Sequence, residues 1–382
     1  MKKIVTIGEL GIIITGNTPP RNNSKLYGNY TPFIKATDIS ETEKYTYHPE
    51  EYYSEEGYNK YIKSLIPKGS TCVVTIGSIG KKMTMAHCDL FINQAMNAII
   101  PNENFDNEYV YYAVKNILSN IKMLDSGTAS GRENVSKSAF SKMQILIEDN
   151  IITQRRIATI LSRYDSLIEN YQKQIKLLEE SAQRLYKEWF VDLRFPGHEN
   201  TKIVDRMPEG WKKKCLGELV CFKRGKTITK KEVIEGNIPV VAGGTEPAYY
   251  CNKSNTGNRV ITISASGANA GYIRMYFEKI WASDCSFIDC SMTNYFHFIY
   301  CYLIANKIAI DNLQKGAAQP HVYPKDINAL ALCCPHNDIL DSFESKISYS
   351  FDLISSLQKQ IHRLTEARDR LLPKLMSGKF FI

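Results

Sequence analysis

Two long stretches of the chain have the periodicity of amphipathic helices, and their apolar positions recur every seven residues. Residues 150–192 and 336–375 contain almost no glycine or proline, which favours long helices. The apolar positions of the two stretches coincide after a shift of 186 residues, and they fall at the a and d positions of a coiled coil. The predicted seam consists of Leu161, Ile168, Ile175, Leu178 and Leu185 in the first helix and of Ile347, Ile354, Leu357, Ile361, Leu364 and Leu371 in the second.

A single apolar stripe most simply packs against the globular domain next to it. Because this stripe occurs twice, each time after a globular segment, we expect the two helices to pack on one another as an antiparallel coiled coil. At ~1.5 Å per residue, about 40 helical residues form a rod of roughly 60 Å. Arg368 occupies an a position, where it either fixes the register of the helices or reaches water at an end of the seam.

The globular segments also repeat. Residues 7–10 (IGEL) before Thr15 and Gly16 reappear as residues 216–219 (LGEL) before Arg224 and Gly225, each read as a short strand that ends in a glycine turn. Residues 73–80 (VVTIGSIG) resemble residues 260–267 (VITISASG), and residues 126–137 resemble residues 315–325. The patterns further predict strands at residues 71–76, 97–100 and 260–264 and helices at residues 108–118 and 296–310. Each half is therefore predicted to be α+β.

These patterns divide the chain into five segments. The tryptophan-containing segments 189–191 (WFV) and 208–211 (PEGW) flank the connection between the halves, and the second contains a turn signal. The expected segments are a first globular domain (1–149), a first long helix (150–192), a linker (193–214), a second globular domain (215–335) and a second long helix with a C-terminal tail (336–382).

Composition places the chain among soluble globular proteins. It has 382 residues, of which 43% are hydrophobic and 23% are charged. No apolar run approaches the ~18 residues of a membrane span, and no signal-peptide core follows Met1, so we expect a cytoplasmic protein without membrane association. The ten cysteines include no Cys-x-x-Cys pair and are read as reduced thiols. The formal charge of +8 is a mild basic bias that suits a polyanionic partner.

Motifs for catalysis are missing from the sequence. It has no Walker-type phosphate loop, no complete dinucleotide fingerprint and no base-methylating tetrapeptide. Asp284, Asp289 and Lys279 would suit a metal-dependent nuclease only if the fold brought them together. Two cysteine and histidine groups, one around Cys285 and one around Cys333, have no spacing typical of structural zinc sites. We therefore predict a noncatalytic chain without a bound metal or cofactor.

Basic and amide side chains cluster in glycine- and serine-rich loops at matching places of both halves, which indicates binding to nucleic acid. Lysine and arginine neutralise phosphates, whereas asparagine, glutamine, serine and arginine read base edges. The candidate DNA-binding residues of the first half are Arg21, Lys25, Lys35, Ser78, Lys81, Lys82, Arg132, Asn134 and Lys137. Those of the second half are Lys223, Arg224, Lys226, Arg259, Ser266, Arg274, Lys315, Gln319 and His321.

Seven short segments stand out in a fixed order along the chain: 15–19 (TGNTP), 34–38 (IKATD), 93–95 (NQA), 127–129 (GTA), 154–158 (QRRIA), 316–320 (GAAQP) and 371–375 (LLPKL). Together with the order of domains and long helices, they resemble the DNA-specificity subunit of Type I restriction-modification enzymes. The resemblance covers nearly the whole chain. The second half departs from it at residues 240–244 (VVAGG), which replace the IKATD block.

The resemblance implies two target recognition domains that each read one half of a split double-stranded DNA sequence, held apart by the paired helices. It also implies a scaffold for two methyltransferase subunits and for restriction subunits. S-adenosylmethionine, ATP and Mg²⁺ would be bound by those partners, together with methyl transfer, base flipping and cleavage. Two alternatives remain: a stand-alone coiled-coil DNA-binding regulator, and a two-lobed enzyme with a site that no motif reveals.

Overall fold

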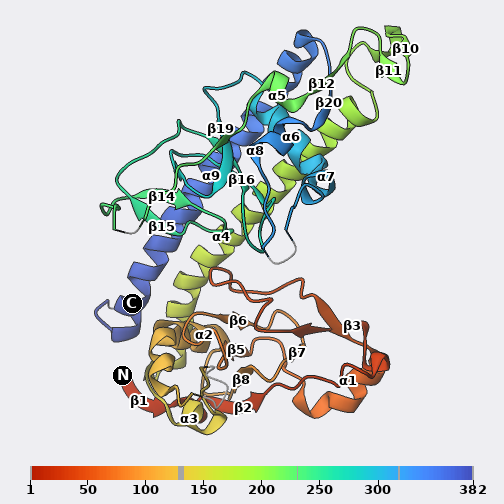
Figure 1. Cartoon of the computed structure of the whole chain (residues 1–382). Helices are drawn as coiled ribbons and strands as arrows, with labels where there is room; N and C mark the ends of the chain where they lie inside the picture. Colours follow the sequence, from red (N-terminus) through yellow and green to blue (C-terminus); the bar gives the residue numbers. More distant parts are fainter. Residues whose placement is uncertain (1, 128–132, 230, 317–318, 381–382) are drawn as a thin grey trace. The chain divides into compact units, whose positions relative to one another are not determined.

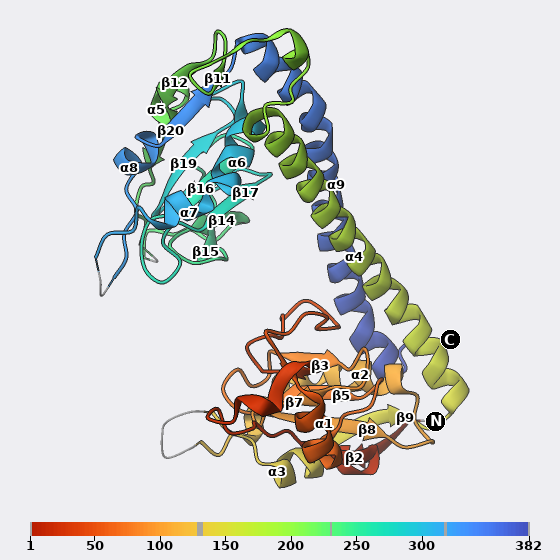
Figure 2. The same cartoon turned by 90° about the vertical axis from the view of Figure 1, so that its right-hand side faces the viewer.

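The computed structural model describes residues 2–127, 133–229, 231–316 and 319–380. The chain forms two compact units: unit 1 contains residues 1–172 and 360–382, and unit 2 contains residues 173–359. Two long helices, α4 (Ile151–Tyr186) and α9 (Asn337–Ser377), are each divided between the units. Each unit is therefore a set of small sheets with a segment of both helices (Figures 1 and 2). Among the described helices, none is long and apolar enough to cross a membrane.

Unit 1 contains three sheets. A four-stranded sheet has the order β2-β8-β5-β6, a three-stranded sheet has the order β4-β3-β7, and β1 pairs with β9. All neighbours are antiparallel except β3 and β7. The strands are β1 (Lys2–Thr6), β2 (Gly11–Thr15), β3 (Tyr27–Ile34), β4 (Glu51–Tyr53), β5 (Thr71–Val74), β6 (Met83–Met85), β7 (Phe91–Ile92), β8 (Met96–Pro101) and β9 (Gln144–Glu148). The helices are α1 (Glu55–Tyr61), α2 (Asn107–Asn116), α3 (Lys137–Lys142) and the 3-10 helices at Ile7–Glu9, Ser24–Leu26, Ile62–Ser64 and Leu118–Leu124.

Unit 2 repeats this topology. Its four-stranded sheet has the order β13-β19-β16-β17, its three-stranded sheet has the order β15-β14-β18, and β12 pairs with β20. The strands are β12 (Lys212–Cys215), β13 (Lys223–Arg224), β14 (Ile238–Val241), β15 (Tyr249–Cys251), β16 (Val260–Ser264), β17 (Ile273–Tyr276), β18 (Trp281–Ala282), β19 (Cys285–Asp289) and β20 (Ala331–Cys334), besides the small hairpin of β10 (Ile203–Val204) and β11 (Met207–Pro208). The helices are α5 (Leu216–Leu219), α6 (Phe296–Ala305), α7 (Lys307–Asp311) and α8 (Pro324–Asn328), with a 3-10 turn at His198–Asn200.

The strand orders confirm the internal repeat. In both units the central strand of the three-stranded sheet has one antiparallel and one parallel neighbour. The parallel pair is β3 with β7 in unit 1 and β14 with β18 in unit 2. The predicted α+β composition of each half is also confirmed. One local prediction was wrong, because the IGEL and LGEL segments are helical turns rather than strands. In the first, Glu9 accepts hydrogen bonds from the amide and the hydroxyl of Thr6, a capping box that starts a helical turn.

The long helices extend to the expected residues. Asn150 starts α4, since its side-chain oxygen accepts a hydrogen bond from the amide of Thr153 at 3.1 Å. The helix continues into one π-helical turn, Lys187–Val191, so helical backbone ends at the predicted place. Strand β12 begins at Lys212, three residues before the predicted second domain, and the domain boundaries themselves stay predictions.

The heptad positions bury apolar side chains within both units. Leu161 of α4 and Leu372 of α9 belong to the core of unit 1, together with Tyr109 of α2. In unit 2, Ala182 and Ile347 belong to one core with Phe298 of α6. The apolar stripes therefore belong to the domain cores, and the core of each unit contains residues of both long helices. Of the predicted seam, five residues are buried (Leu161, Ile168, Ile347, Ile354 and Leu357), and six are half-buried (Ile175, Leu178, Leu185, Ile361, Leu364 and Leu371).

Arg368 does not reach water. Its side chain is 4% exposed, and its Nη1 donates to Oδ1 of Asp165 in α4 at 2.5 Å. The other oxygen of Asp165 accepts a hydrogen bond from the hydroxyl of Tyr112 in α2, also at 2.5 Å. This buried contact joins the two long helices and the core helix of unit 1, and it supports the register-fixing reading of Arg368.

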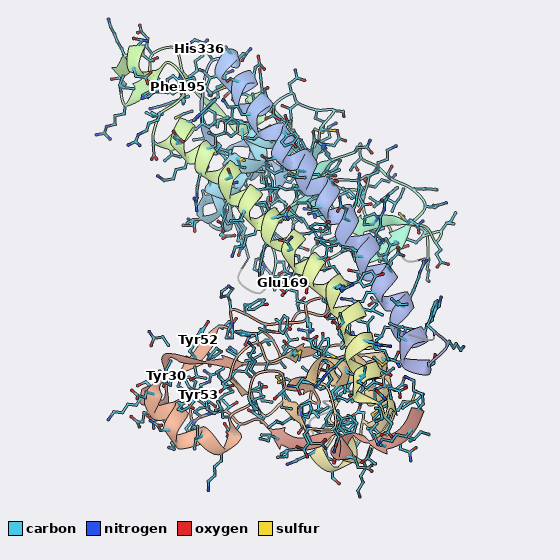
Figure 3. The ribbon with its side chains drawn as sticks, turned by 180° about the vertical axis from the view of Figure 1, so that it is seen from behind. Tyr30, Tyr52, Tyr53, Glu169, Phe195 and His336 are labelled. Carbon is cyan, nitrogen blue, oxygen red and sulfur yellow. The ribbon has the colours of Figure 1, made fainter. Side chains whose placement is uncertain are left out.

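Aromatic side chains of unit 2 pack against one another near the end of α4. Phe190 packs against Phe343 of α9 and Phe298 of α6, with ring centroids 4.9 Å apart in both pairs. In the following segment, Phe195 packs against Trp211 at 5.1 Å. Gly210 adopts φ +85°, and a Cβ there would lie 2.0 Å from the ring of His336, so this turn requires glycine. Figure 3 labels Phe195 and His336 in this region.

Candidate nucleic-acid interface

Glycine allows two loops of unit 1 to approach one another closely. Gly16 follows β2, and a Cβ there would lie 2.2 Å from the carbonyl oxygen of Ile92. The amide of Asn17 donates to that same carbonyl at 3.0 Å. The hydroxyl of Thr18 donates to the side-chain oxygen of Gln94, which links the loops by a second contact. The segment after β2 and the segment after β7 therefore form one surface.

Two further loops join this surface. The amides of Thr75 and Ile76 both donate to the carbonyl of Ala95, at 2.8 and 3.1 Å. The amide of Gly77 donates to the carbonyl of Glu133 at 3.0 Å. We name the resulting group loop cluster 1, and it consists of residues 16–18, 76–78, 93–95 and 133–134.

The matching loops of unit 2 converge in the same way. The amide of Lys226 donates to the carbonyl of Ala282 at 2.9 Å, and the amide of Gly267 donates to the carbonyl of Pro320 at 3.1 Å. We name this group loop cluster 2, and it consists of residues 225–226, 265–267, 283–284 and 320–321. Both clusters are built from the same four connections of a repeated topology.

The hydrogen bonds correct one detail of the repeat. Gly77 and Gly267 have matching φ angles, +88° and +81°, and both donate to the loop that precedes α3 or α8. The alignment of residues 73–80 with residues 260–267 pairs Gly80 with Gly267, so it is three residues out of register with the structure. The match of residues 126–137 with residues 315–325 is confirmed, because Val135 and Val322 donate to the equivalent carbonyls of Thr75 and Ala265.

The candidates of the first half differ in how free they are to bind. Ser78 is exposed in loop cluster 1, Lys81 is exposed beside it, and Lys137, the first residue of α3, is exposed as well. Asn134 is held by its backbone, whose amide donates to Asp125 at 2.7 Å, while its side chain forms no hydrogen bond with a described group. Lys82 is half-buried and donates to the carbonyl of Ala36 at 3.5 Å. Arg132 lies outside the described residues.

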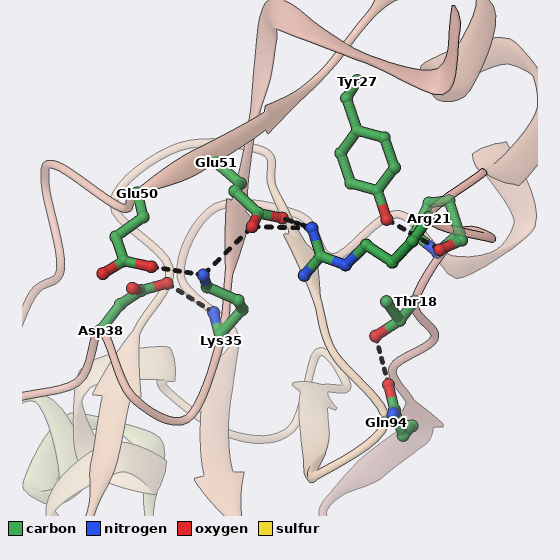
Figure 4. A network of polar contacts seen from close by, with 9 residues as sticks. Thr18, Arg21, Tyr27, Lys35, Asp38, Glu50, Glu51 and Gln94 are labelled. Atoms are coloured by element: carbon green, nitrogen blue, oxygen red, sulfur yellow. Dashed lines mark hydrogen bonds and ion pairs between the residues drawn. The ribbon is translucent and has the colours of Figure 1, made fainter. Parts of the chain in front are cut away.

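Arg21 and Lys35 are held together by one carboxylate (Figure 4). Nη1 of Arg21 donates to both oxygens of Glu51 at 2.8 Å, and Nζ of Lys35 lies 3.2 Å from Glu51 and 2.5 Å from Glu50. The pKa of Lys35 is raised, chiefly by its hydrogen bond to Glu50. A phosphate would have to compete with these carboxylates. Lys25, by contrast, is exposed and forms no ion pair with a described residue.

The tyrosines around this network are mostly structural. Tyr53 is completely buried and stacks on Phe91 at 4.4 Å, whereas Tyr30 is 57% exposed. Figure 3 shows Tyr30, Tyr52 and Tyr53 in this part of unit 1. Another tyrosine, Tyr47, donates to Glu169 of α4 at 2.7 Å and connects a loop of unit 1 to the segment of that helix that belongs to unit 1.

Asp284 organises loop cluster 2. Its Oδ1 accepts from Nη2 of Arg224 at 2.5 Å, and its Oδ2 accepts from the hydroxyl of Ser266. The side chain of Arg224 remains 42% exposed. A guanidinium oriented by a carboxylate keeps further N–H donors in a fixed plane, which suits bidentate contact with a guanine edge or a phosphate.

Two arginines of unit 2 are engaged elsewhere. Arg274 lies over the ring of Tyr276 at 4.9 Å and pairs with Glu246 at 3.0 Å. Arg259 forms an ion pair with Asp352 of α9 and lies 3.4 Å from the ring nitrogen of His297. Arg259 is therefore a helix contact of unit 2 rather than part of loop cluster 2.

The last basic group of unit 2 lies at loop cluster 2. Lys315 and His321 exchange backbone hydrogen bonds of 2.9 and 2.8 Å, and Nζ of Lys315 pairs with Asp326 at 2.8 Å. The ring of His321 stacks on Tyr323 with an interplanar angle of 18°. Gln319, Lys223 and Lys226 are exposed, and neither lysine pairs with a described carboxylate.

The alternative metal sites do not assemble in the described residues. Asp284 precedes β19 and Asp289 ends it, so the two carboxylates lie at opposite ends of one strand. Asp289 instead accepts hydrogen bonds from the amide of Gly257 and the hydroxyl of Ser291. No group of three histidine, cysteine or acidic side chains suited to a metal ion occurs in the described part of the chain. Burial raises the pKa of the Cys285 thiol to about 12, as expected for an inert core cysteine.

Sequence reasoning missed one basic pocket of unit 1. An open pocket of about 400 Å³ is lined by Lys60 of α1, Lys63 of the following 3-10 turn and Lys137 of α3, with Asn17 of loop cluster 1 beside them. Lys60 and Lys63 lack a distinctive sequence signal, because their neighbourhood with Lys137 arises only from the fold.

The structure thus contains two repeated α+β units, each with a cluster of four converging loops and with exposed lysines in or beside that cluster. Residues 2–180 and 208–363 match the model of the Type I restriction modification DNA specificity domain. The chain belongs to this family.

Individual relatives agree with this assignment. The chain is 29% identical to the Type I restriction enzyme MjaIX specificity subunit of Methanocaldococcus jannaschii, over 99% of this chain and 93% of that protein. It is 28% identical to a putative type I specificity subunit of Mycoplasma genitalium, over 81% of each. Among solved structures, a type I restriction-modification S subunit from M. genitalium has the same fold, with a TM-score of 0.59, 19% identity and coverage of 98% and 96% of the two chains.

Proposed function

We propose that this chain is the noncatalytic DNA-reading subunit of a Type I restriction-modification enzyme, in which each unit reads one half of a split DNA target. The observation that supports this most directly is the repeat of four converging loops on the same strand order in both units. Exposed lysines near these loops contact phosphates, whereas Asn134 in unit 1 and Arg224 and Gln319 in unit 2 read base edges.

The two loop clusters differ chemically, so the two half-sites differ in sequence. Loop cluster 1 offers amide and hydroxyl groups: the amide of Asn134 suits the edge of adenine, and the hydroxyl of Ser78 can contact the edges of different bases. Beside loop cluster 2, the guanidinium of Arg224 is held in place by Asp284 and suits guanine. The target is therefore asymmetric, as expected for one chain that contains two diverged units.

The helices α4 and α9 act as an antiparallel coiled-coil spacer between the two recognition domains. Support comes from contacts within each unit: Asp165 with Arg368 in unit 1, and Phe190 at the end of α4 with Phe343 in unit 2. Because half-sites on DNA must match the separation of the domains that read them, the helices set the length of the unread spacer.

Catalysis takes place in partner subunits. Two methyltransferase subunits dock on this scaffold and bind S-adenosylmethionine, and restriction subunits bind ATP and Mg²⁺. This division of labour agrees with the lack of catalytic motifs in the sequence.

The test is single-molecule mapping of adenine methylation in cells that express the chain with and without the methyltransferase subunit encoded beside it. We expect a split motif only when both proteins are present. A folded complex that methylates no new site would contradict the proposal and favour a coiled-coil regulator that acts alone.

A further inference from the structure

The lysine pocket of unit 1 has a composition that favours a phosphate group. Its basic side chains come from two places in the sequence, Lys60 and Lys63 on one side and Lys137 on the other. All three are exposed, and none forms an ion pair with a described carboxylate. The pocket lining, which consists of described residues, includes no acidic side chain. Three like charges around one pocket repel each other unless an anion lies between them.

Hydrogen bonds position the polar groups of Asn17 and Ser64 in the pocket wall. Asn17 donates to the hydroxyl of Ser64 at 3.0 Å, and its side-chain oxygen accepts from the hydroxyl of the buried Tyr53 at 3.1 Å. The hydroxyl of Ser64 donates in turn to the carbonyl of Tyr61 at 2.9 Å. This arrangement leaves the second amide hydrogen of Asn17 for a ligand, since an amide nitrogen has two.

The same residues connect the pocket to the recognition surface. Asn17 belongs to loop cluster 1, and Thr15, another lining residue, ends the strand that leads into it. A phosphate in the pocket would thus lie next to loops that read bases, and it would fix the register of the duplex on them.

Unit 2 has no such pocket element. In unit 1, β4 is followed by α1, which provides Lys60 and leads into the turn with Lys63. In unit 2 the equivalent strand, β15, is followed by residues 252–259, which are all described and contain no helix. The pocket is therefore a feature of one half of the repeat.

We propose that Lys60, Lys63 and Lys137 form a phosphate-binding pocket that holds the DNA backbone against loop cluster 1. This proposal rests on the proposed DNA-reading function. The same chemistry would also accept a free phosphate compound such as ATP. The position beside the reading loops favours the DNA backbone.

The experiment measures binding of the full chain to a random-sequence 30-base-pair duplex at several salt concentrations. A contact with one phosphate contributes about 0.9 to the slope of log K against log salt, and three separate contacts contribute about 2.7. The K60A/K63A/K137A variant is therefore expected to lower the slope by about 0.9 to 2.7, with an affinity loss of at least about eightfold at 0.1 M salt. The matched control is K142A, which removes an exposed lysine of the same helix α3 outside the pocket.

Each outcome decides between the possibilities. A slope that falls in the pocket variant and not in K142A supports the proposal, with thermal melting to show that both variants remain folded. An unchanged slope in the folded variant overturns it. If ATP or inorganic phosphate binds the parent and not the variant while the slope stays constant, the pocket serves a free phosphate and the DNA assignment is wrong. Single K63Q and K137Q variants repeat the measurement if the triple variant is unstable.

Methylation mapping separates this proposal from the proposed function. If the parent directs methylation of a split motif while the pocket variant keeps the parental slope, only the pocket assignment fails. If the parent directs no methylation, the proposed function itself fails.

Discussion

Replacing Arg368 by methionine tests whether the buried ion pair fixes the two helices in register. In the parent, the Arg368 and Asp165 side chains are only 4% and 8% exposed. The R368M change keeps most of the side-chain volume and leaves Asp165 as a buried carboxylate with the Tyr112 hydroxyl as its one remaining hydrogen-bond partner among the described residues. Removing one partner of a buried pair typically costs about 3–5 kcal/mol.

The expected loss is large enough to measure. For domains of 150–250 residues, 1 kcal/mol corresponds to about 2–4 °C in Tm, so R368M should lower the Tm of unit 1 by roughly 6–20 °C. Calorimetry gives the size of the shift, and amide hydrogen exchange in α2 assigns it to unit 1. The matched control is R370M on the same helix, because Arg370 is 79% exposed and its pair with Glu366 is worth at most about 1 kcal/mol.

Compensating changes show whether charge or packing is responsible. The triple variant Y112F/D165L/R368M removes the arginine, the carboxylate and the hydroxyl together, so no buried polar group is left without a partner. We expect its stability to lie within about 1–2 kcal/mol of the parent, since apolar replacements of buried pairs are often neutral or stabilising. An R368M variant that loses less than about 1 kcal/mol would refute the reasoning, as would a triple variant less stable than R368M.

Three further predictions concern spacing, charge and pH. Deleting residues 169–175 and 358–364 removes about 10 Å from each helix and should shorten the unread spacer by about three base pairs in methylation mapping, whereas an unchanged spacer would contradict the ruler role. Lys81→Ala should weaken binding to all DNA sequences and lower the slope of log K against log salt by about 0.9. Lys82→Ala should lower that slope less, because Lys82 donates to the carbonyl of Ala36. Equal slopes for the two variants in salt titrations would contradict this prediction. Burial, aided by the charge of Arg368, lowers the pKa of Lys115 to about 8, so the unfolded chain holds a proton there that the folded chain releases between about pH 8 and 10. The free energy of unfolding of the parent, measured in urea, should therefore rise by up to about 1.4 kcal/mol per pH unit relative to that of K115M in that range. A constant difference between the two proteins would show that Lys115 keeps its ordinary pKa.

The repeated sequence pattern predicted the architecture because it appears in both halves. Heptad spacing identified α4 and α9, and the shared order of strands and glycine turns predicted two α+β units. The helical turn at Ile7–Glu9 was predicted as a strand, although the Thr6 and Glu9 pair contains the spacing of a capping box. In that segment a local hydrogen-bond pattern outweighed the apolar pattern.

The state of individual side chains depended on contacts that the sequence does not display. Arg21 and Lys35 appeared as free cations, but the pairing of β3 with β4 places Glu51 beside both. Lys60 and Lys137 are far apart in the sequence, and only the packing of the sheets brings them to one pocket. Residue types therefore indicated nucleic-acid binding, whereas the fold decides which cations are available.

The central claim is that each unit reads its own half-site. The most direct measurement is single-molecule methylation mapping of the chain expressed with its methyltransferase subunit, comparing the parent with Asn134→Ala in unit 1 and Gln319→Ala in unit 2. We predict that Asn134→Ala relaxes one position in one half of the motif, that Gln319→Ala relaxes a position in the other half, and that the spacer stays constant. Relaxation of the same half by both substitutions, or of neither half, would contradict the account.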